Sequence, residues 1–147
     1  MPQDAQRVHG VFESIARGYD AANDRISLGR HHVWKKALVD RAVAATVASD
    51  PGLVLDVCCG TGDVTEALAR ASESTLVAGL DFSKSMLDIA RARTAGLDNV
   101  QLVEGDAMEL PFDDATFDAA VISFGLRNTP DYERVLREMA RVVRPGG

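Results

Sequence analysis

The stretch from Asp56 to Gly62, read as DVCCGTG, has the residue types that bring a backbone close to a small ligand. It follows the apolar run 53–55, and a helical pattern begins near Thr61. Gly60 and Gly62 allow a tight turn and a close approach, and the start of the helix offers free N–H groups. A strand that turns into a helix in this way indicates a site for a nucleotide-like ligand.

A carboxylate lies twenty-one residues beyond Gly60. Asp81 directly follows a second apolar run, 75–80, and Phe82 comes next. At the end of a second parallel strand, such a carboxylate is placed to accept hydrogen bonds from the two hydroxyls of a ribose. We therefore expect an adenosine-containing cofactor, held by Gly60, Thr61, Gly62, Asp81 and Phe82.

The glycine spacing and the acids indicate which cofactor this is. A dinucleotide fingerprint needs a third glycine, but Asp63-Val64-Thr65 follows Gly62. The acids Asp56 and Asp63 disfavour a ligand with two phosphates and suit a cationic one. S-adenosyl-L-methionine, which has an adenosine, an ammonium and a sulfonium but no phosphate, fits this pattern. A nicotinamide dehydrogenase is the distant alternative.

Two further strand ends carry residues that fit the same ligand. Asp106 and Ala107 follow the apolar run 100–103, where a carboxylate accepts the amino group of an adenine and a small side chain lies against the ring. Ser123 ends the run 117–124 and should face the methionine part of the cofactor. Parallel strands end at one edge of a sheet, so all these residues are expected to meet there.

Composition narrows the class of protein further. The chain has 147 residues, a formal net charge of −6 and 46% hydrophobic residues, which is enough for one domain with a core. The acidic balance gives no electrostatic reason to bind nucleic acid. The sequence has no transmembrane run and no signal-like N-terminus, so a cytoplasmic location is the default. Cys58 and Cys59 are adjacent and are interpreted as reduced thiols beside the turn, and no metal site is expected.

The periodicity predicts strands that alternate with helices, which is typical of a parallel α/β sheet. A helical N-terminal cap is expected over about 1–50 and a Rossmann-like core over about 51–147, within a single domain. Helices are expected at about 8–18, 31–48, 61–71, 84–94 and 131–143, and strands at about 53–57, 75–80, 100–103 and 117–124. Ser83 is predicted to cap the helix 84–94, and the inner side of the last helix is assigned to Val135, Leu136, Met139, Ala140 and Val143.

The whole chain resembles class I S-adenosylmethionine-dependent methyltransferases, and more narrowly the C-methyltransferases of menaquinone and ubiquinone biosynthesis. The resemblance rests on three stretches: Val11 to Ala16 with Tyr19-Asp20 and Asn23; Leu28-Gly29 with Trp34 to Leu38; and Ile122 to Asn128 with Leu136 to Met139 and Arg144 to Gly147. The chain departs from many members at Cys58-Cys59, where they carry smaller residues.

The resemblance implies methyl transfer to a ring carbon of a polyprenylated quinol, most simply demethylmenaquinol, with ubiquinone precursors as the alternative. A quinol carbon becomes nucleophilic when a ring hydroxyl loses its proton, which calls for a base or a cation that stabilises the quinolate. Arg127 is expected in that catalytic role, or paired with Asp131 as an ordinary helix-start contact. Asn128 is expected to orient Arg127 or the substrate oxygen, and Tyr19 and Asn23 to help close the substrate pocket.

The resemblance also implies a sheet ordered 3-2-1-4 that lacks the usual C-terminal strands, because similar methyltransferases continue beyond a Pro-Gly-Gly turn. An apolar fourth strand at the edge would then favour a homo-oligomer, and the lipophilic substrate implies transient contact with a membrane surface. Two rival functions remain: methylation of another small molecule on the same fold, or a truncated, non-catalytic module that binds the cofactor or a partner.

Overall fold

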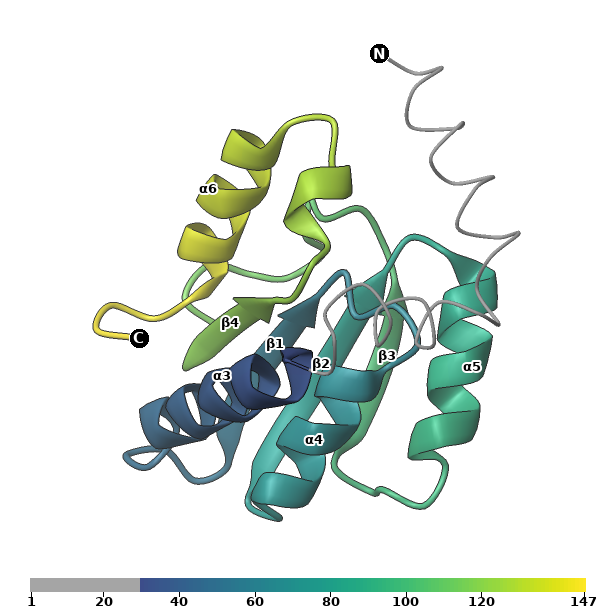
Figure 1. The fold of residues 1–147 in the computed structure, drawn as a ribbon. Coiled ribbons are helices and arrows are strands. Elements are labelled where there is room, and N and C mark those ends of the chain that lie inside the picture. Colours follow the sequence, from purple (N-terminus) through teal and green to yellow (C-terminus); the bar gives the residue numbers. More distant parts are fainter. Residues whose placement is uncertain (1–29) are drawn as a thin grey trace.

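The computed structural model describes residues 30–147, which form a four-stranded parallel sheet with helices on both sides (Figure 1). The strand order is β3-β2-β1-β4, as predicted. The register pairs Gly52 with Thr75, Val54 with Ala119 and Val77 with Val100. The elements in chain order are α3 (His31–Ala45), β1 (Gly52–Val57), α4 (Asp63–Ala71), β2 (Thr75–Asp81), α5 (Lys84–Thr94), β3 (Val100–Glu104), β4 (Ala119–Ile122), the 3-10 turn η2 (Leu126–Asn128) and α6 (Tyr132–Val142).

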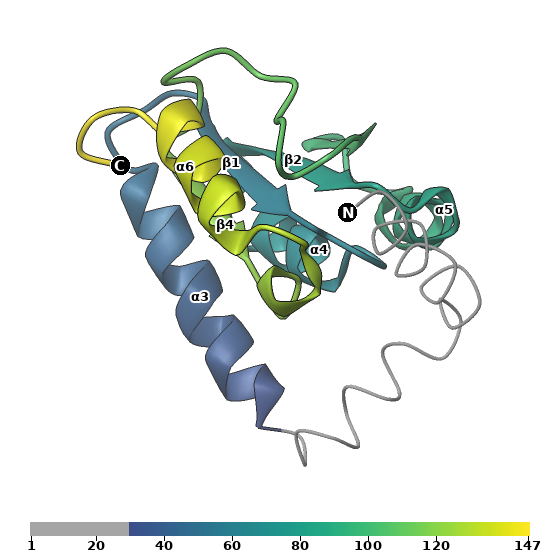
Figure 2. The same ribbon diagram turned by 90° about the horizontal axis from the view of Figure 1, so that it is seen from above.

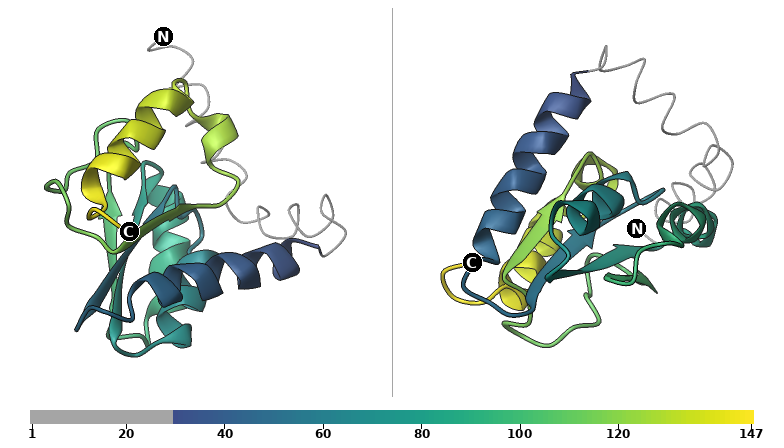
Figure 3. Two further views of the ribbon diagram at one scale, coloured as in Figure 1. Left: turned by 90° about the vertical axis from the view of Figure 1, so that its left-hand side faces the viewer. Right: turned by 90° about the horizontal axis from the view of Figure 1, so that it is seen from below.

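Two apolar clusters hold α3, α4 and α6 on opposite faces of the sheet (Figures 2 and 3). On one face, α3 and α4 pack against the strands through buried side chains that include Val39, Val64 and Leu68. On the other face, α6 and the long loop 105–116 pack through Val135, Val142 and Leu110. The carboxyl ends of the strands all reach the same edge, which leaves that edge to be lined by turns.

Capping side chains fix where two of the helices begin. The hydroxyl of Ser83 accepts a hydrogen bond from the N–H of Met86 at 3.3 Å, which confirms the predicted cap of α5. The carboxylate of Asp131 accepts one from the N–H of Arg134 at 3.0 Å and caps α6. Asp131 therefore has its own structural role at this helix start.

The sequence placed three features incorrectly. The helix predicted from residue 61 begins at Asp63, because Gly62 takes a left-handed conformation before it. The strand predicted over 117–124 is only Ala119–Ile122, because Phe117 instead forms a bridge with Val143 and the chain turns sharply at Phe124. On α6, Leu136 and Ala140 are exposed rather than inward-facing.

Among the described residues, no helix has both the length and the apolar composition needed to cross a bilayer. The predicted helix over 8–18 and the predicted substrate residues Tyr19 and Asn23 lie outside the described part of the chain.

Candidate functional site

A cavity of about 430 Å³ opens where the carboxyl ends of the strands meet. It brings together residues from all four strand ends, as the sequence predicted for a cofactor site. The predicted residues that line it are Gly60, Thr61, Asp81, Phe82, Asp106, Ala107, Ser123 and Asn128. Gly62 and Arg127 do not line this cavity.

The two glycines of the turn after β1, Gly60 and Gly62, have different structural roles. Gly60, at φ 54°, has nothing within 4 Å of the place where a Cβ would sit, and it lines the cavity. Gly62, at φ 81°, lies against α5, where a Cβ would be only 2.9 Å from the Cβ of Ala90. Gly60 therefore lets a ligand approach the backbone, whereas Gly62 lets the start of α4 pack against α5.

Asp81 links the ends of β1 and β2. One carboxylate oxygen accepts a hydrogen bond from the N–H of Gly60 at 2.8 Å, and the other accepts one from the N–H of Ser83 at 2.9 Å. The side chain is buried, yet it lines the cavity. Because each carboxylate oxygen has two acceptor sites, these bonds orient Asp81 and leave it capable of accepting ribose hydroxyls.

Asp56 lies on the floor of the cavity and is fully buried. The hydroxyl of Thr65 donates a hydrogen bond to it at 2.7 Å. Burial, reinforced by the nearby negative charges of Asp81 and Asp63, raises the pKa of Asp56 to about 7 against the opposing effect of the Thr65 hydrogen bond. A cationic ligand in the cavity would favour the ionised form of this carboxyl.

Two basic residues that no sequence pattern indicates pair with Asp63, the other acid of the turn, and both line the cavity. The ammonium of Lys35, on α3, contacts both carboxylate oxygens of Asp63 at 3.0 Å. Arg93, on α5, lies 3.8 Å from Asp63 and donates a hydrogen bond to the hydroxyl of Thr61 at 3.3 Å. Asp63 is therefore already paired, and of the two acids invoked for a cationic ligand Asp56 is the better candidate. Periodicity could not have located these partners, because they lie 28 residues before and 30 residues after Asp63.

The two cysteines are free thiols, as expected. Burial, together with the charge of nearby aspartates, raises the pKa of Cys58 to about 12 and that of Cys59 well above its usual range. Neutral thiols in these surroundings are poor nucleophiles and poor metal ligands. Their contribution is to the shape of the turn.

The chain bends tightly beyond β4 and closes one side of the cavity. Phe124 takes φ 60°, an uncommon conformation for an aromatic residue, and its carbonyl accepts a hydrogen bond from the side chain of Asn128 at 3.4 Å. Gly125 packs so closely that a Cβ there would be 2.5 Å from the Cβ of Cys58. Strained backbone of this kind gathers at functional sites, and here it joins the ends of β1 and β4.

Arg127 is exposed and lies outside the cavity. Its guanidinium carbon is 5.7 Å from the ring centroid of Phe124, and it lines a shallow groove that shares Phe124 and Thr129 with the cavity. Asn128, by contrast, lines the cavity itself. The predicted catalytic pair is thus divided between two neighbouring surfaces.

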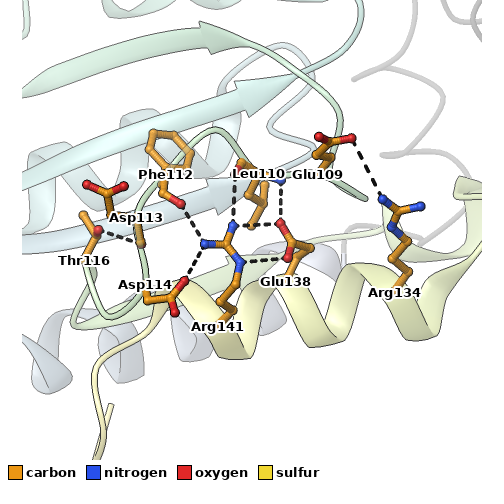
Figure 4. A network of polar contacts seen from close by, with 9 residues as sticks. All are labelled: Glu109, Leu110, Phe112, Asp113, Asp114, Thr116, Arg134, Glu138 and Arg141. Carbon is orange, nitrogen blue, oxygen red and sulfur yellow. Dashed lines mark hydrogen bonds and ion pairs between the residues drawn. The ribbon is translucent and has the colours of Figure 1, made fainter.

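The loop that carries Asp106 and Ala107 is fastened to α6 by Arg141 (Figure 4). The guanidinium donates to the carbonyls of Leu110 and Phe112 at 3.0 and 2.8 Å and pairs with Glu138 at 2.8 Å. Glu138 in turn accepts a hydrogen bond from the N–H of Leu110 at 2.8 Å. These contacts hold a loop without regular structure against the core and so position the third strand end.

Comparison with known structures agrees with the fold. A protein from Methanococcus maripaludis has a TM-score of 0.75 at 25% identity, covering 92% of this chain and 60% of that one. YcgJ from Bacillus subtilis has a TM-score of 0.70 at 27% identity, covering 80% and 48%. The [4+2]-cyclase SpnF has a TM-score of 0.64 at 35% identity, covering 74% and 41%.

Relatives found by sequence indicate a narrower family than the similar structures do. The chain is 52% identical over 143 residues to the demethylmenaquinone methyltransferase of Bacillus licheniformis, covering 97% of this chain and 60% of the relative. It is 50% identical to the enzyme of the same name from Staphylococcus aureus MRSA252, covering 97% and 58%. The chain thus spans about three fifths of these relatives. The profile of the ubiE/COQ5 methyltransferase family matches residues 1–147, and the chain belongs to that family.

Proposed function

We propose that this chain binds S-adenosyl-L-methionine in the cavity at the strand ends and takes part in the C-methylation of a polyprenylated quinol, demethylmenaquinol to menaquinol. The observation that carries the proposal is the convergence of Gly60, Asp81, Asp106 and Ser123 on one cavity. The ubiE/COQ5 family match and the names of the relatives support the reaction and the substrate. A ubiquinone precursor is the alternative acceptor in this family.

The residues of the cavity fit this cofactor. Gly60 leaves open space for a close approach, and the buried carboxylate of Asp81 provides acceptors of the kind that ribose hydroxyls need. Asp106 holds its turn by accepting a hydrogen bond from the N–H of Met108 at 2.8 Å, and Ala107 beside it presents a small side chain for a flat base. Buried Asp56 matches a ligand that carries positive charge.

When bound, the cofactor supplies a methyl group already activated on a sulfonium. The chain must then hold the quinol ring in line with that methyl and stabilise the ring oxygen after its hydroxyl proton is lost. We assign the ring oxygen to Asn128 at the cavity wall and to Arg127, which lines the adjoining groove and whose permanent charge would stabilise a quinolate at the boundary of the two hollows. Ser123, between β4 and Phe124, would face the methionine part of the cofactor. Tyr19 and Asn23 are proposed to close the substrate side.

The proposal is tested by incubating the protein with S-adenosyl-L-methionine and a reduced demethylated naphthoquinol, followed by mass spectrometry of the product. We expect a ring-methylated quinol that forms from the reduced substrate and not from the quinone, because only the quinol ionises to a nucleophile. Arg127→Gln should slow the reaction about 100-fold, while Arg91→Gln, on an exposed face of α5, should not. Cofactor binding without methylation of any quinol would instead favour another acceptor or a binding module.

We further propose that the single domain is cytoplasmic, contacts the membrane surface transiently to reach its substrate, and self-associates through the edge of β4. In the described sheet, β4 pairs with β1 on one side, and on the other side the bridge between Phe117 and Val143 lies just before the strand. An edge strand with unpaired backbone groups favours association with a second chain. Light scattering should give the mass of a dimer, and a monodisperse monomer would contradict this assembly.

A further inference from the structure

A row of exposed apolar side chains leads away from the cavity. A shallow groove is lined by Phe124, Leu126, Arg127, Thr129 and Tyr132, and Phe124 and Thr129 also line the cavity. The two hollows are therefore contiguous, with Phe124 as their common wall. We call the second hollow, with the flanking side chains of Trp34 and Leu136, the aromatic groove.

The exposure of these side chains is unusual for their type. Trp34 is 57% exposed, Tyr132 57%, Leu136 45% and Phe124 37%. Trp34 comes from α3, and its ring centroid is 6.5 Å from that of Phe124. Tyr132 and Leu136 lie one turn apart on α6, so they share one face of that helix. Segments far apart in the sequence thus contribute to one apolar surface, and such surfaces mark binding sites.

The backbone holds this surface in place. Phe124 keeps its strained conformation because Asn128 binds its carbonyl and Gly125 packs against Cys58. The guanidinium of Arg127 lies against the Phe124 ring. The aromatic wall is therefore fixed before any ligand arrives, which reduces the entropy lost on binding.

We propose that the aromatic groove binds the isoprenoid tail of the substrate, with the ring beside the cofactor at the Asn128 wall of the cavity and the first isoprene units lying along Phe124, Tyr132 and Leu136. The proposal rests on the proposed function, because it takes the substrate to be a prenylated quinol. A ligand with a polar head and a long apolar tail needs a polar-lined cavity continuous with an apolar exit. The tail has no charges or hydrogen-bonding groups, and Phe124, Leu126 and Tyr132 offer it aromatic and aliphatic surface, while Arg127 and Thr129 are the polar members of the groove.

The chain contains one tryptophan, so Trp34 fluorescence reports on this surface alone. The experiment titrates the protein, with cofactor product present, with a ring-only naphthoquinone and with homologues that carry one, two and three isoprene units. Affinity is followed by calorimetry and contact with the groove by quenching of Trp34. We expect binding to tighten at least about tenfold between the ring-only compound and the two-unit homologue, with stronger quenching by the tailed compounds.

The variant Leu136→Ser should remove most of this gain while leaving the affinity for the ring-only compound unchanged. Leu76→Ser is the matched control, because Leu76 is 43% exposed at the start of β2, the opposite end of that strand from the cavity. Equal affinity for all homologues, or an undiminished gain in affinity with tail length in Leu136→Ser, would overturn the tail site. Binding of the ring-only compound would still support the proposed function. If cofactor binds but neither the ring-only nor the tailed compounds do, both proposals fail.

A membrane surface is the alternative occupant of the aromatic groove, and Trp34 fluorescence distinguishes it from the isoprenoid tail. Vesicles of phosphatidylcholine and phosphatidylglycerol are added to wild type and to Leu136→Ser. If they shift Trp34 emission to the blue only in wild type, and tail length has no effect on affinity, the groove is a bilayer contact and the tail site is overturned.

Discussion

The carboxylate of Asp81 accepts a hydrogen bond from the backbone N–H of Gly60 at 2.8 Å. This bond joins the acid at the end of β2 to the glycine turn at the end of β1. The two sequence features that first indicated a cofactor are therefore one physical unit, and a change in either should disturb the other.

Replacing Asp81 with Asn should weaken cofactor binding at least about tenfold, because an amide nitrogen would face the N–H of Gly60 or Ser83 where a carboxylate oxygen accepts now. The dissociation constant for S-adenosyl-L-methionine, measured by calorimetry, checks this. Asp88→Asn, on the exposed face of α5, provides the control. An unchanged dissociation constant in Asp81→Asn would mean that Asp81 does not hold the cofactor.

Asp56 should make stability depend on pH in a defined direction. Its pKa is about 7 in the folded protein and ordinarily 3.8, so between these values the folded state holds a proton that the unfolded chain has lost. The free energy of unfolding should therefore fall as the pH rises from about 4 to about 7, by up to about 1.4 kcal/mol per pH unit.

Asp56→Asn carries no titrating proton and should lack this contribution. Denaturant unfolding of both proteins at about pH 5 and about pH 7.5 measures the difference. Relative to wild type, the variant should be more stable at the higher pH than at the lower one. Parallel pH profiles for the two proteins would show that Asp56 titrates normally.

Gly62→Ala should lower the free energy of unfolding by about 1–3 kcal/mol, because Gly62 has φ 81° and its new Cβ would meet that of Ala90. Gly96→Ala is a matched control with nothing within 4 Å of its Cβ and should change stability by less than about 0.5 kcal/mol. Equal effects of the two substitutions in denaturant unfolding would refute the packing role of Gly62.

Arg141→Ala should lower Tm more than Arg137→Ala does. Arg141 binds two loop carbonyls, Glu138 and Asp114, whereas Arg137 makes an exposed pair with Glu133 one turn away. Because the loop carries Asp106, Arg141→Ala should also weaken cofactor binding. Calorimetric melting of the two variants, with and without cofactor, checks both effects, and indistinguishable variants would contradict the account of Figure 4.

The strand order and the strand-end residues of the cavity could be predicted because local signals determine them. Apolar runs mark the strands, and Asp81 and Asp106 follow them directly, so parallel pairing alone brings these residues together. The cap at Ser83 was equally local. The shortening of β4 was not, because it depends on how Phe117 and Val143 meet across the fold.

The features that could not be predicted from the sequence depend on long-range contacts. The pairing of Lys35 with Asp63 spans 28 residues, and no periodic pattern encodes it. Leu136 has the spacing of an inward-facing residue on α6, but its side chain is exposed in the folded chain. The position of Arg127 outside the cavity follows from the turn at Phe124, which no residue type announces, since glycine rather than phenylalanine is usual at positive φ.

The most direct test of the account is calorimetric titration of the purified chain with S-adenosyl-L-methionine, with NAD as the control ligand. We predict micromolar binding of S-adenosyl-L-methionine and none of NAD, because Asp56 and Asp81 line the cavity and the turn after β1 lacks the third glycine of a dinucleotide fingerprint. Binding of NAD with equal affinity, or no binding of S-adenosyl-L-methionine, would contradict it.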